Sequence, residues 1–444
     1  MEVTVGIDIG TTSVKAVAVD AAGAVVRGVR IPHALVAPDA DRFEHDAVAA
    51  WRVGPTTALA AVSEGLEVEG VTVAAMVPSL CGVDADGIPV TAGLLYGDAR
   101  GRGDRHGVGV QGEVVGFARW LTAQPGVTAL WPAQAVANRA LCGVGAIDTS
   151  TAKTMMPLFD GQGWSDAVCD ELGITAAMLP DLSPGFAPIG ATLDGAAVGG
   201  GSIDAFAEQL VADARAPGDV LVICGTTLIV WALTDTLRDA PGLWSMPYTV
   251  PGLYAIGGAS NAGGLFIDRV RALVGDPVGR PNRTDVPVWL PYLRGERTPL
   301  HDPHRRAELL DVHLGHGPIE VLRAAHEATG FVVRHHLEVA RVEARRLVVV
   351  GGGTRSSRWM EALADATGLP VDVAAHAEGA AIGAARIART TAGLDPDLSG
   401  ADSWARLRGR VEPRPEWAAA CEVRYRRFLD STRRGRPNEP PTIT

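Results

Sequence analysis

The sequence lacks the patterns that mark secreted, membrane-embedded and nucleic-acid-binding proteins. No apolar run is long enough to cross a bilayer. The N-terminus begins with strand-like alternation instead of the charged and apolar regions of a secretory signal. Basic residues are not concentrated before "RYRRF" and "RRGR" near the end, and the net charge is −11, which argues against nucleic acid as the main partner. We expect a cytoplasmic protein with neither a membrane nor a nucleic-acid partner.

The sequence also lacks a cysteine pattern of the kind that binds zinc or forms a disulfide framework. There is no Cys-x-x-Cys pair, and the number of cysteines is odd. The five are scattered along the chain: Cys81, Cys142, Cys169, Cys224 and Cys421. This usage is typical of reduced, mostly buried thiols in a cytoplasmic protein, and a structural zinc site is not expected.

What is present is the composition of a soluble globular protein with sizeable cores. Hydrophobic residues make up 47% of the 444 residues and charged residues 20%, and this length suits two or three domains. The polar turn "ADARAPGDV" at 212–220 is the best boundary. We predict an N-terminal domain over 1–215, a C-terminal domain over 216–430 and a disordered tail over 431–444.

Two similar stretches lie near the start of each half, "VGIDIGTTSVKAVAVD" at 5–20 and "LVICGTTLIVWALT" at 221–234. In the first, apolar and polar residues alternate with the period of a strand, and a second β-branched run follows a short break at Gly10. Each stretch predicts a β-hairpin whose turn carries a glycine and two hydroxyls. Such a turn lets backbone N–H groups and hydroxyls approach a phosphate; the alternative is an ordinary hairpin with a polar tip.

The second half carries further regular patterns. An amphipathic helix is predicted over 318–341. "GLYAIGGASNAGGLFIDRV" at 252–270 indicates a strand, a glycine-rich turn and a helix, and 345–374 indicates a strand, a glycine turn, a helix and a strand. "EGAAIGAARIAR" at 378–389 is a helix rich in small residues, which allows close packing.

Together these motifs resemble the FGGY carbohydrate kinases, a family of the actin-like ATPase superfamily. The two hairpins look like its phosphate loops, "VVVGGGTRSSRWMEALADATGLPV" looks like its adenosine motif, and "LPYLRGERTPLHDP" is similar to its signature around Gly-Glu-Arg-Thr-Pro. The resemblance implies two α/β, ribonuclease H-like domains facing each other across a central cleft. The first would bind sugar and phosphate, and the second would bind the nucleotide, with ATP and Mg²⁺ as cofactors.

The resemblance also assigns residues to the phosphates and the nucleotide. Asp8, at a strand end beside the first turn, would hold Mg²⁺, most often through water; the alternative is a carboxylate that satisfies turn N–H groups. The positions that match the family's nucleotide contacts are Thr11, Thr12, Ser13, Lys15, Thr226, Gly258, Ala262, Gly353 and Ser357.

Asp204, in "GGGSIDAFAEQL" at 199–210, follows three glycines at a predicted helix start. By the resemblance it is the general base that receives the proton of the sugar hydroxyl. The alternative is an aspartate that only caps the helix. We expect the N–H donors of the helix start to keep its carboxylate ionised.

The predicted sugar pocket departs from the family pattern. "LLYGDARG" at 94–101 keeps Asp98 and Arg100 of the family's Trp-Asn-Asp-x-Arg segment, so Asp98 is a candidate substrate contact, with an ion pair to Arg100 as the alternative. In "AAMVPS", Val77 and Pro78 stand where xylulokinases carry the Met-His pair that touches xylulose. That replacement removes a polar contact and counts against xylulose.

The sequence thus predicts ATP-dependent phosphorylation of a hydroxyl of a small sugar, most simply a ketopentose such as xylulose or ribulose. Two alternatives stay open: a non-catalytic regulator that binds sugar or nucleotide on the same fold, and an ATPase without a sugar substrate. Since many family members dimerise, a homodimer is a further expectation of the resemblance.

Overall fold

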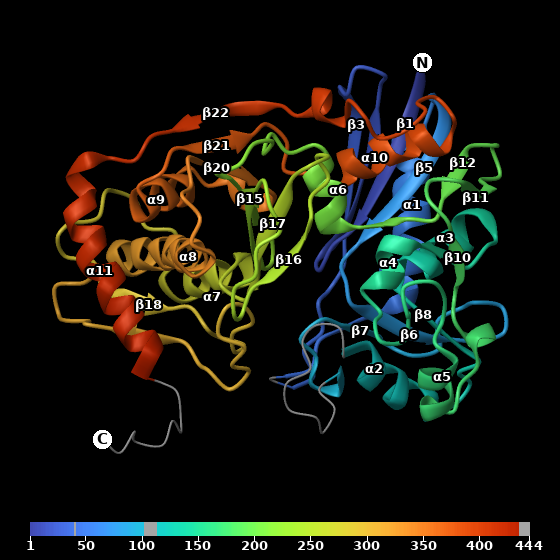
Figure 1. Ribbon diagram of the computed structural model, residues 1–444, viewed down its shortest axis with the longest axis horizontal. Coiled ribbons are helices and arrows are strands. Elements are labelled where there is room, and N and C mark those ends of the chain that lie inside the picture. The colour runs from blue at the N-terminus through green and yellow to red at the C-terminus, as the bar shows by residue number, and fades with distance from the viewer. Residues whose placement is uncertain (40, 102–112, 435–444) are drawn as a thin grey trace. The chain divides into compact units, whose positions relative to one another are not determined.

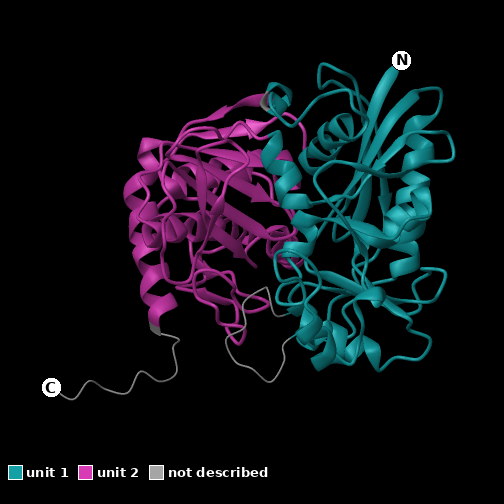
Figure 2. Ribbon diagram, turned by 45° about the vertical axis from the view of Figure 1, so that its right-hand side comes forward, with its two compact units in different colours: residues 1–211, 378–405 teal, residues 212–377, 406–444 magenta. Residues whose placement is uncertain are grey.

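A computed structural model describes residues 1–39, 41–101 and 113–434 (Figure 1). The chain divides into two compact units, which Figure 2 shows in different colours. Unit 1 contains residues 1–211 and 378–405, and unit 2 contains 212–377 and the chain from 406 onward. The division at 211/212 lies close to the boundary predicted near 215. Residues 378–405, expected in the second domain, belong instead to unit 1.

Unit 1 is built on a mixed sheet in the order β11-β12-β5-β1-β2-β3, with β13 also paired to β5. The predicted first hairpin is confirmed, because β1 and β2 pair antiparallel in the register Asp8↔Lys15, whereas β1 and β5 pair parallel. The strands of this sheet are β1 (Glu2–Ile9), β2 (Ser13–Val19), β3 (Val25–Pro32), β5 (Glu67–Ala75), β11 (Pro188–Ala191), β12 (Ala197–Gly199) and β13 (Ser202–Ile203).

Helices cover both faces of this sheet, and the alternation along β1 decides which side chain meets which helix. The valines and isoleucines of β1 from Val3 to Ile9 lie in a core with residues of α1 (Gly54–Ser63) and α3 (Ala133–Cys142). Thr4 and Gly6 face the other way, toward α10 (Gly379–Thr391). A methyl group on Gly6 would lie 1.8 Å from a backbone oxygen of α10, so only glycine allows this approach. Asp8 is two residues after Gly6 in the same strand, so it lies on the same face of the sheet as Gly6, the face covered by α10.

The remaining elements of unit 1 form two smaller sheets and short helices. The four-stranded sheet runs β4-β7-β6-β8, and β9 pairs with β10. The strands are β4 (Glu44–His45), β6 (Ser79–Val83), β7 (Gly93–Leu95), β8 (Ala129–Trp131), β9 (Ala146–Asp148) and β10 (Asp181–Ser183). The helices are α2 (Glu113–Thr122), α4 (Thr149–Lys153), α5 (Asp166–Leu172) and α6 (Asp204–Leu210), with single turns η1 (Val48–Val53), η2 (Ala99–Gly101), η4 (Ala176–Met178) and η6 (Ala401–Trp404).

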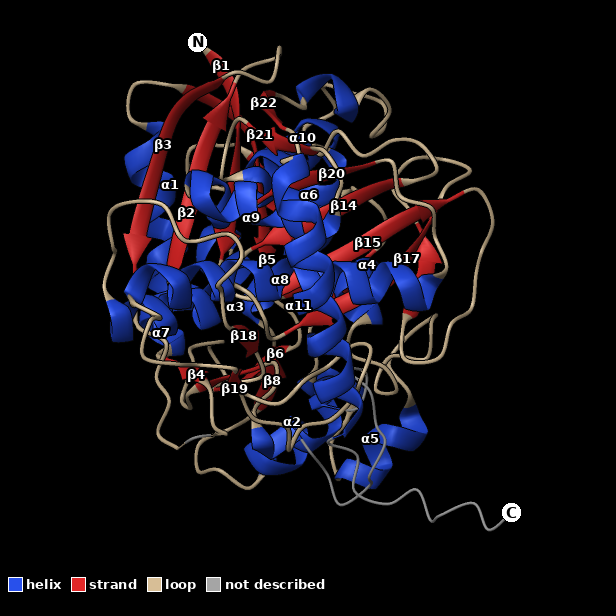
Figure 3. Ribbon diagram, turned by 90° about the vertical axis from the view of Figure 1, so that its left-hand side faces the viewer, coloured by secondary structure: helices blue, strands red, loops and turns tan. Residues whose placement is uncertain are grey.

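Unit 2 contains a second seven-stranded sheet, in the order β16-β17-β15-β14-β20-β21-β22. The predicted second hairpin is confirmed as antiparallel β14 and β15, and Figure 3 shows these strands beside β17 and β20. The sheet strands are β14 (Asp219–Cys224), β15 (Leu228–Thr234), β16 (Trp244–Pro247), β17 (Tyr254–Ser260), β20 (Arg346–Val350), β21 (Val371–Ala374) and β22 (Leu407–Val411); a separate pair is β18 (Val288–Leu290) and β19 (Glu308–Leu310).

The helices of unit 2 agree with the periodicity of the sequence. The predicted long helix is α8 (Pro318–Ala340), which packs against α7 (Gly264–Val274) and α9 (Ser357–Thr367). The short helix η5 (Gly352–Arg355) occupies the glycine turn before α9. The last helix, α11 (Pro415–Arg434), corrects the predicted tail, since 431–434 complete a helix whose apolar side packs into the core at Phe428. The rest of that tail lies outside the described residues.

The cysteines and the helices bear on the expectations about thiols and membrane spans. The five cysteines are free, and four of them are buried. Within the described ranges, no helix is both long and apolar enough to cross a membrane.

Candidate functional site

The predicted magnesium and base residues lie in one region of unit 1, around the end of β1 and the start of α6. Asp8 is 4% exposed, and its Oδ2 accepts a hydrogen bond from Nζ of Lys15 at 2.8 Å. The turn between the strands is closed by its own backbone, with Gly10 N–H donating to the carbonyl of Ser13 at 3.0 Å. The charge of Asp8 raises the pKa of Lys15, so Lys15 stays an ammonium. The carboxylate of Asp8 thus bonds to a lysine of the next strand, an interaction that the sequence reading did not foresee.

Asp204 is the first residue of α6, and Ile203 before it occupies the N-cap position. Its Oδ1 accepts a hydrogen bond from the backbone N–H of Ala205 at 2.7 Å. Burial, together with the charge of Asp8, raises the pKa of Asp204 to about 7, and the ammonium of Lys15 opposes this increase. The expectation that helix donors keep Asp204 ionised is therefore corrected, because desolvation outweighs the backbone N–H donors. A proton affinity near neutrality suits a general base.

The first turn is held by residues that the sequence reading did not connect with it. Thr11 Oγ1 and the hydroxyl of Tyr96 lie 3.1 Å apart, and the carbonyl of Thr11 accepts a hydrogen bond from Nε2 of His45 at 2.8 Å. Trp51 Nε1 donates to Nδ1 of His45 at 3.0 Å, which fixes the proton of that ring on Nε2. Burial lowers the pKa of His45 to about 4. The turn therefore rests on a neutral imidazole. The only signal in the sequence was Tyr96, which stands where the family segment Trp-Asn-Asp-x-Arg begins with tryptophan.

The remaining predicted residues of the first turn differ in exposure. Thr11 and Ser13 are buried, whereas Thr12 is exposed at the tip. The hydroxyl of Thr12 is therefore accessible from outside the turn, and those of Thr11 and Ser13 are not. The contact of these residues with a phosphate stays a prediction.

The sugar-pocket candidate Asp98 is fully buried and forms the ion pair that was its alternative role. Its carboxylate accepts from the backbone N–H of Phe43 at 2.6 Å and from the Nε and terminal nitrogen of Arg100 at 2.9 and 2.7 Å. Arg100 also pairs with Glu44 at 2.7 Å. Val77 is half-buried and Pro78 is buried just before β6. With Asp98 committed to Arg100, its contact with a sugar stays a prediction.

In unit 2, the second turn packs directly against the start of α7. The N–H of Gly264 donates to the carbonyl of Gly225 at 2.8 Å, and the N–H of Leu265 donates to the carbonyl of Thr226 at 3.1 Å. Ala262, before the helix, is fully buried. These contacts bring the predicted Thr226 and Ala262 to the same place, where a hairpin turn meets the first turn of a helix.

The Gly-Glu-Arg-Thr-Pro segment holds this place together. Glu296 is 3% exposed and accepts from Ser260 Oγ at 2.6 Å and from the backbone N–H of Asn261 at 3.2 Å. Thr298 Oγ1 donates to the carbonyl of Ala259 at 3.0 Å. A methyl group on Gly258 would lie 2.5 Å from Thr298, so protein covers this strand glycine. The segment therefore fixes the end of β17, and Gly258 has a packing role in addition to any role near the nucleotide.

The other two predicted nucleotide residues lie at the turn before α9. Gly353 is in η5, where a methyl group would meet Cys224 and the ring of Trp359 at 2.6 Å. Ser357 is exposed at the start of α9 and lines a cavity of about 830 Å³ within unit 2. Ile319, Leu322 and His326 of α8 line the same cavity, and its rim carries several arginines: Arg280, Arg283, Arg323, Arg358 and Arg414. Thr226, Gly258, Ala262 and Gly353 are not among its lining residues.

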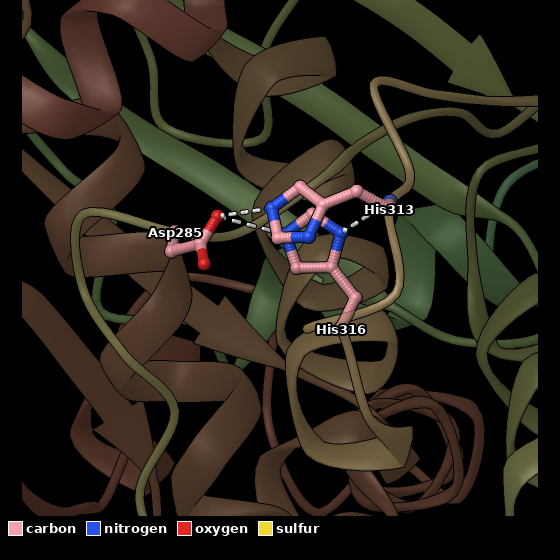
Figure 4. Close-up of side chains that lie close together, drawn as sticks. All are labelled: Asp285, His313 and His316. Atoms are coloured by element: carbon pink, nitrogen blue, oxygen red, sulfur yellow. Dashed lines mark hydrogen bonds and ion pairs between the residues drawn. The ribbon is translucent and has the colours of Figure 1, made fainter.

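A cluster of Asp285, His313 and His316 has the residue types of a metal site, but its hydrogen bonds suit a different role (Figure 4). Nε2 of His313 and Nε2 of His316 lie 2.9 and 3.0 Å from Oδ1 of Asp285. Backbone N–H groups donate to the Nδ1 atom of each ring, so the proton of each neutral ring is on Nε2. Metal binding through Nε2 would require that proton on Nδ1, facing another donor. The cluster fits a carboxylate that ties two loops together.

Comparison with known proteins agrees with these features. Residues 220–392 match the model of the FGGY family of carbohydrate kinases, C-terminal domain. Over these residues the chain is similar to that family. Two curated relatives are a xylulose kinase of Escherichia coli (strain K12), 26% identical over 51% of this chain and 49% of that protein, and a glycerol kinase of Cereibacter sphaeroides (strain ATCC 17029), 30% identical over 63% and 62%. The chain thus spans about half to three fifths of the length of these relatives.

A solved structure extends the likeness to the whole chain. The gluconate kinase from Lactobacillus acidophilus matches with a TM-score of 0.80 at 18% identity, covering 98% of both chains. Identity this low shows the fold alone. The predicted α/β, actin-like fold with two domains is confirmed by this match and by the two mixed sheets. The cleft between the domains stays a prediction.

Proposed function

We propose that this protein is an ATP-dependent kinase that phosphorylates a hydroxyl of a small sugar. The observation that supports it best is the grouping of Asp8, Lys15 and Asp204 in unit 1, where the pKa of Asp204 is raised to about 7. A group with that proton affinity can take the hydroxyl proton near neutral pH. The alternative, a non-catalytic regulator on the same fold, would be favoured by loss of Asp8 or Asp204, and both are present.

In this proposal Asp204 accepts the proton from the sugar oxygen as that oxygen attacks the γ-phosphoryl group. Phosphoryl transfer depends mainly on positioning and on charge stabilisation. Asp204 would also hold the hydroxyl in line, and Thr12 with the turn N–H groups would hold phosphate oxygens. Lys15, ionised beside Asp8, places a positive charge near the same phosphates.

The donor set of this region fits Mg²⁺. Asp8 offers carboxylate oxygens, the ligand type that this ion prefers, and a carboxylate at a strand end can hold its water shell. When bound, the ion would neutralise charge on the phosphates. For the nucleotide, we propose that the base occupies the cavity beside Ser357 in unit 2, which is large enough for it.

The identity of the sugar is a separate part of the proposal. A ketopentose such as xylulose or ribulose is the first candidate, although Val77 and Pro78 replace the residues expected to touch xylulose. The relatives act on different compounds by their names, which widens the set to be tested. A homodimer and a cytoplasmic location are likewise proposals that rest on the family.

The deciding experiment is ADP release from ATP and Mg²⁺ with a panel of xylulose, ribulose, glycerol and gluconate, together with a no-sugar control. We expect one panel member to stimulate ADP release, and the Asp204→Asn variant to lose that stimulation. ADP release without any sugar would favour an ATPase. Saturable sugar binding with no turnover would favour the regulator.

A further inference from the structure

A second carboxyl group, that of Glu208, lies on α6 one helical turn after Asp204. Residues four apart share one face of a helix, so the two carboxyls point to the same side. The side chain of Glu208 is 6% exposed, and its Oε1 has no hydrogen-bond partner among the described residues. Leaving such an atom unpaired destabilises a folded protein. The mechanism proposed above makes no use of this residue.

The carboxyl of Glu208 is seated on the first residues of α10. The backbone N–H of Ala380 interacts favourably with it and opposes the rise of its pKa. A methyl group on Gly379 would lie 2.4 Å from Oε1 and 2.9 Å from Cδ of Glu208, so glycine at 379 makes room for this carboxyl. The N-cap residue Glu378 makes no side-chain capping bond of its own. Glu208 therefore supplies, from α6, an acceptor that the start of α10 lacks.

These contacts tie together the elements that carry the candidate site. Helix α10 packs on β1, the strand of Asp8, at Gly6, and α6 and α10 are packed against each other. The charges of Lys15, Asp8 and Asp204 all act on the carboxyl of Glu208. Glu208 thus links the helix of the proposed base to the helix that packs on the strand of the proposed magnesium residue.

We propose that Glu208 is a positioning residue for Asp204. Its carboxyl, held by Gly379 and Ala380, fixes the first turn of α6 so that Asp204 stays beside Asp8 and Lys15. This inference rests on the proposed role of Asp204 in the kinase reaction. Burial raises the pKa of Glu208 to about 8, so the carboxyl is mostly neutral at pH 7, and a glutamine of the same shape should serve in its place.

The test compares Glu208→Gln, Glu208→Leu and Gly379→Ala with the parent, using the sugar that stimulates turnover. Glu208→Gln keeps an oxygen that can accept from the N–H of Ala380, and we expect the kcat of this variant to be within about threefold of the parent value. Leucine removes the acceptor, and Gly379→Ala displaces the carboxyl without removing it. Each should lower kcat about tenfold while the KM for ATP changes less than twofold, because the nucleotide is held in unit 2. The double variant Glu208→Leu/Gly379→Ala should lose no more than the worse single variant, since both act through one contact.

Making the Glu208→Leu substitution in the Asp204→Asn variant separates a positioning role from general damage to the enzyme. If Glu208 acts through Asp204, Glu208→Leu should cause no further loss of kcat once the base is gone. An equal tenfold loss in both backgrounds would overturn the proposal, as would a Glu208→Leu enzyme at the parent rate. If the kcat of Glu208→Gln were as low as that of Glu208→Leu, Glu208 would act by its charge, and this result would also contradict the positioning role. Failure of the base assignment would be seen separately, as an Asp204→Asn enzyme with parent activity.

Discussion

Replacing Asp204 with asparagine should lower activity and at the same time raise stability. Asparagine keeps the shape of the side chain and an oxygen that can accept the N–H of Ala205, and the two residues cap helices about equally. What changes is the charge. Loss of a general base lowers kcat by about 10²-fold or more, and we expect the KM for ATP to stay near the parent value.

The stability effect follows from the raised pKa of Asp204. In the unfolded chain this carboxyl ionises above its ordinary value of 3.8, and in the folded protein only above about 7. Between these values the unfolded state releases its proton first, so the folded protein loses stability as the pH rises, and the full cost is present above pH 7. The difference corresponds to about 4 kcal/mol as an upper bound, which solvent at this partly exposed side chain reduces.

The assay is thermal unfolding of the parent and the variant at pH 4.5 and pH 8, together with turnover at pH 8. The variant should melt a few degrees higher at pH 8 and show a much smaller gain at pH 4.5. Asp166→Asn is a matched control, because Asp166 is also the first residue of a helix in unit 1 but is exposed; it should change neither property. An Asp204→Asn protein that is active, or whose gain in stability is equal at both pH values, would refute the reasoning.

Three further predictions concern the same region. Asp8→Ala should lower turnover about 10²-fold or more at ordinary Mg²⁺ concentrations, while circular dichroism shows a folded protein; a normal rate would remove the magnesium role. Lys15→Met should move the acidic limb of the pH–rate profile to higher pH, because the ammonium of Lys15 lowers the pKa of Asp204; an unmoved or downward-shifted limb would contradict this. Tyr96→Phe should raise the KM for ATP about fivefold, since it removes one hydrogen bond of about 1 kcal/mol from the turn at Thr11, and an unchanged KM would show that the bond does not order the turn.

Local pattern in the sequence was sufficient to predict the two hairpins and the helices α6 to α10. Alternation with period 2 predicted β1 with β2, and apolar spacing with period 3.6 predicted α8, since these patterns report directly on which face of an element is buried. The glycine turns before α7 and α9 were predicted in the same way. The order of these motifs along the chain was enough to indicate the FGGY family, and Asp8 and Asp204 followed from it as candidates.

What the sequence could not give depended on which segments pack together. The return of 378–405 to unit 1 is a matter of long-range packing, because α10 lies on β1 more than 370 positions earlier in the chain. That packing places Glu208 on Gly379, and no local spacing relates these two residues. The same holds for Tyr96 and His45 behind Thr11, and for the ion pair that occupies Asp98.

The protonation states were also decided by tertiary structure. Helix position alone suggested an ionised Asp204, because it considers only the local N–H donors. The folded chain removes much of the solvent from around the carboxyl and sets Asp8 near it, and both raise its pKa, to about 7. The sequence by itself therefore determined which chemical groups this protein has and the secondary structure that carries them. Only the tertiary structure decided their neighbours and their proton affinity, because desolvation and charge interactions depend on distances that the order of residues does not contain.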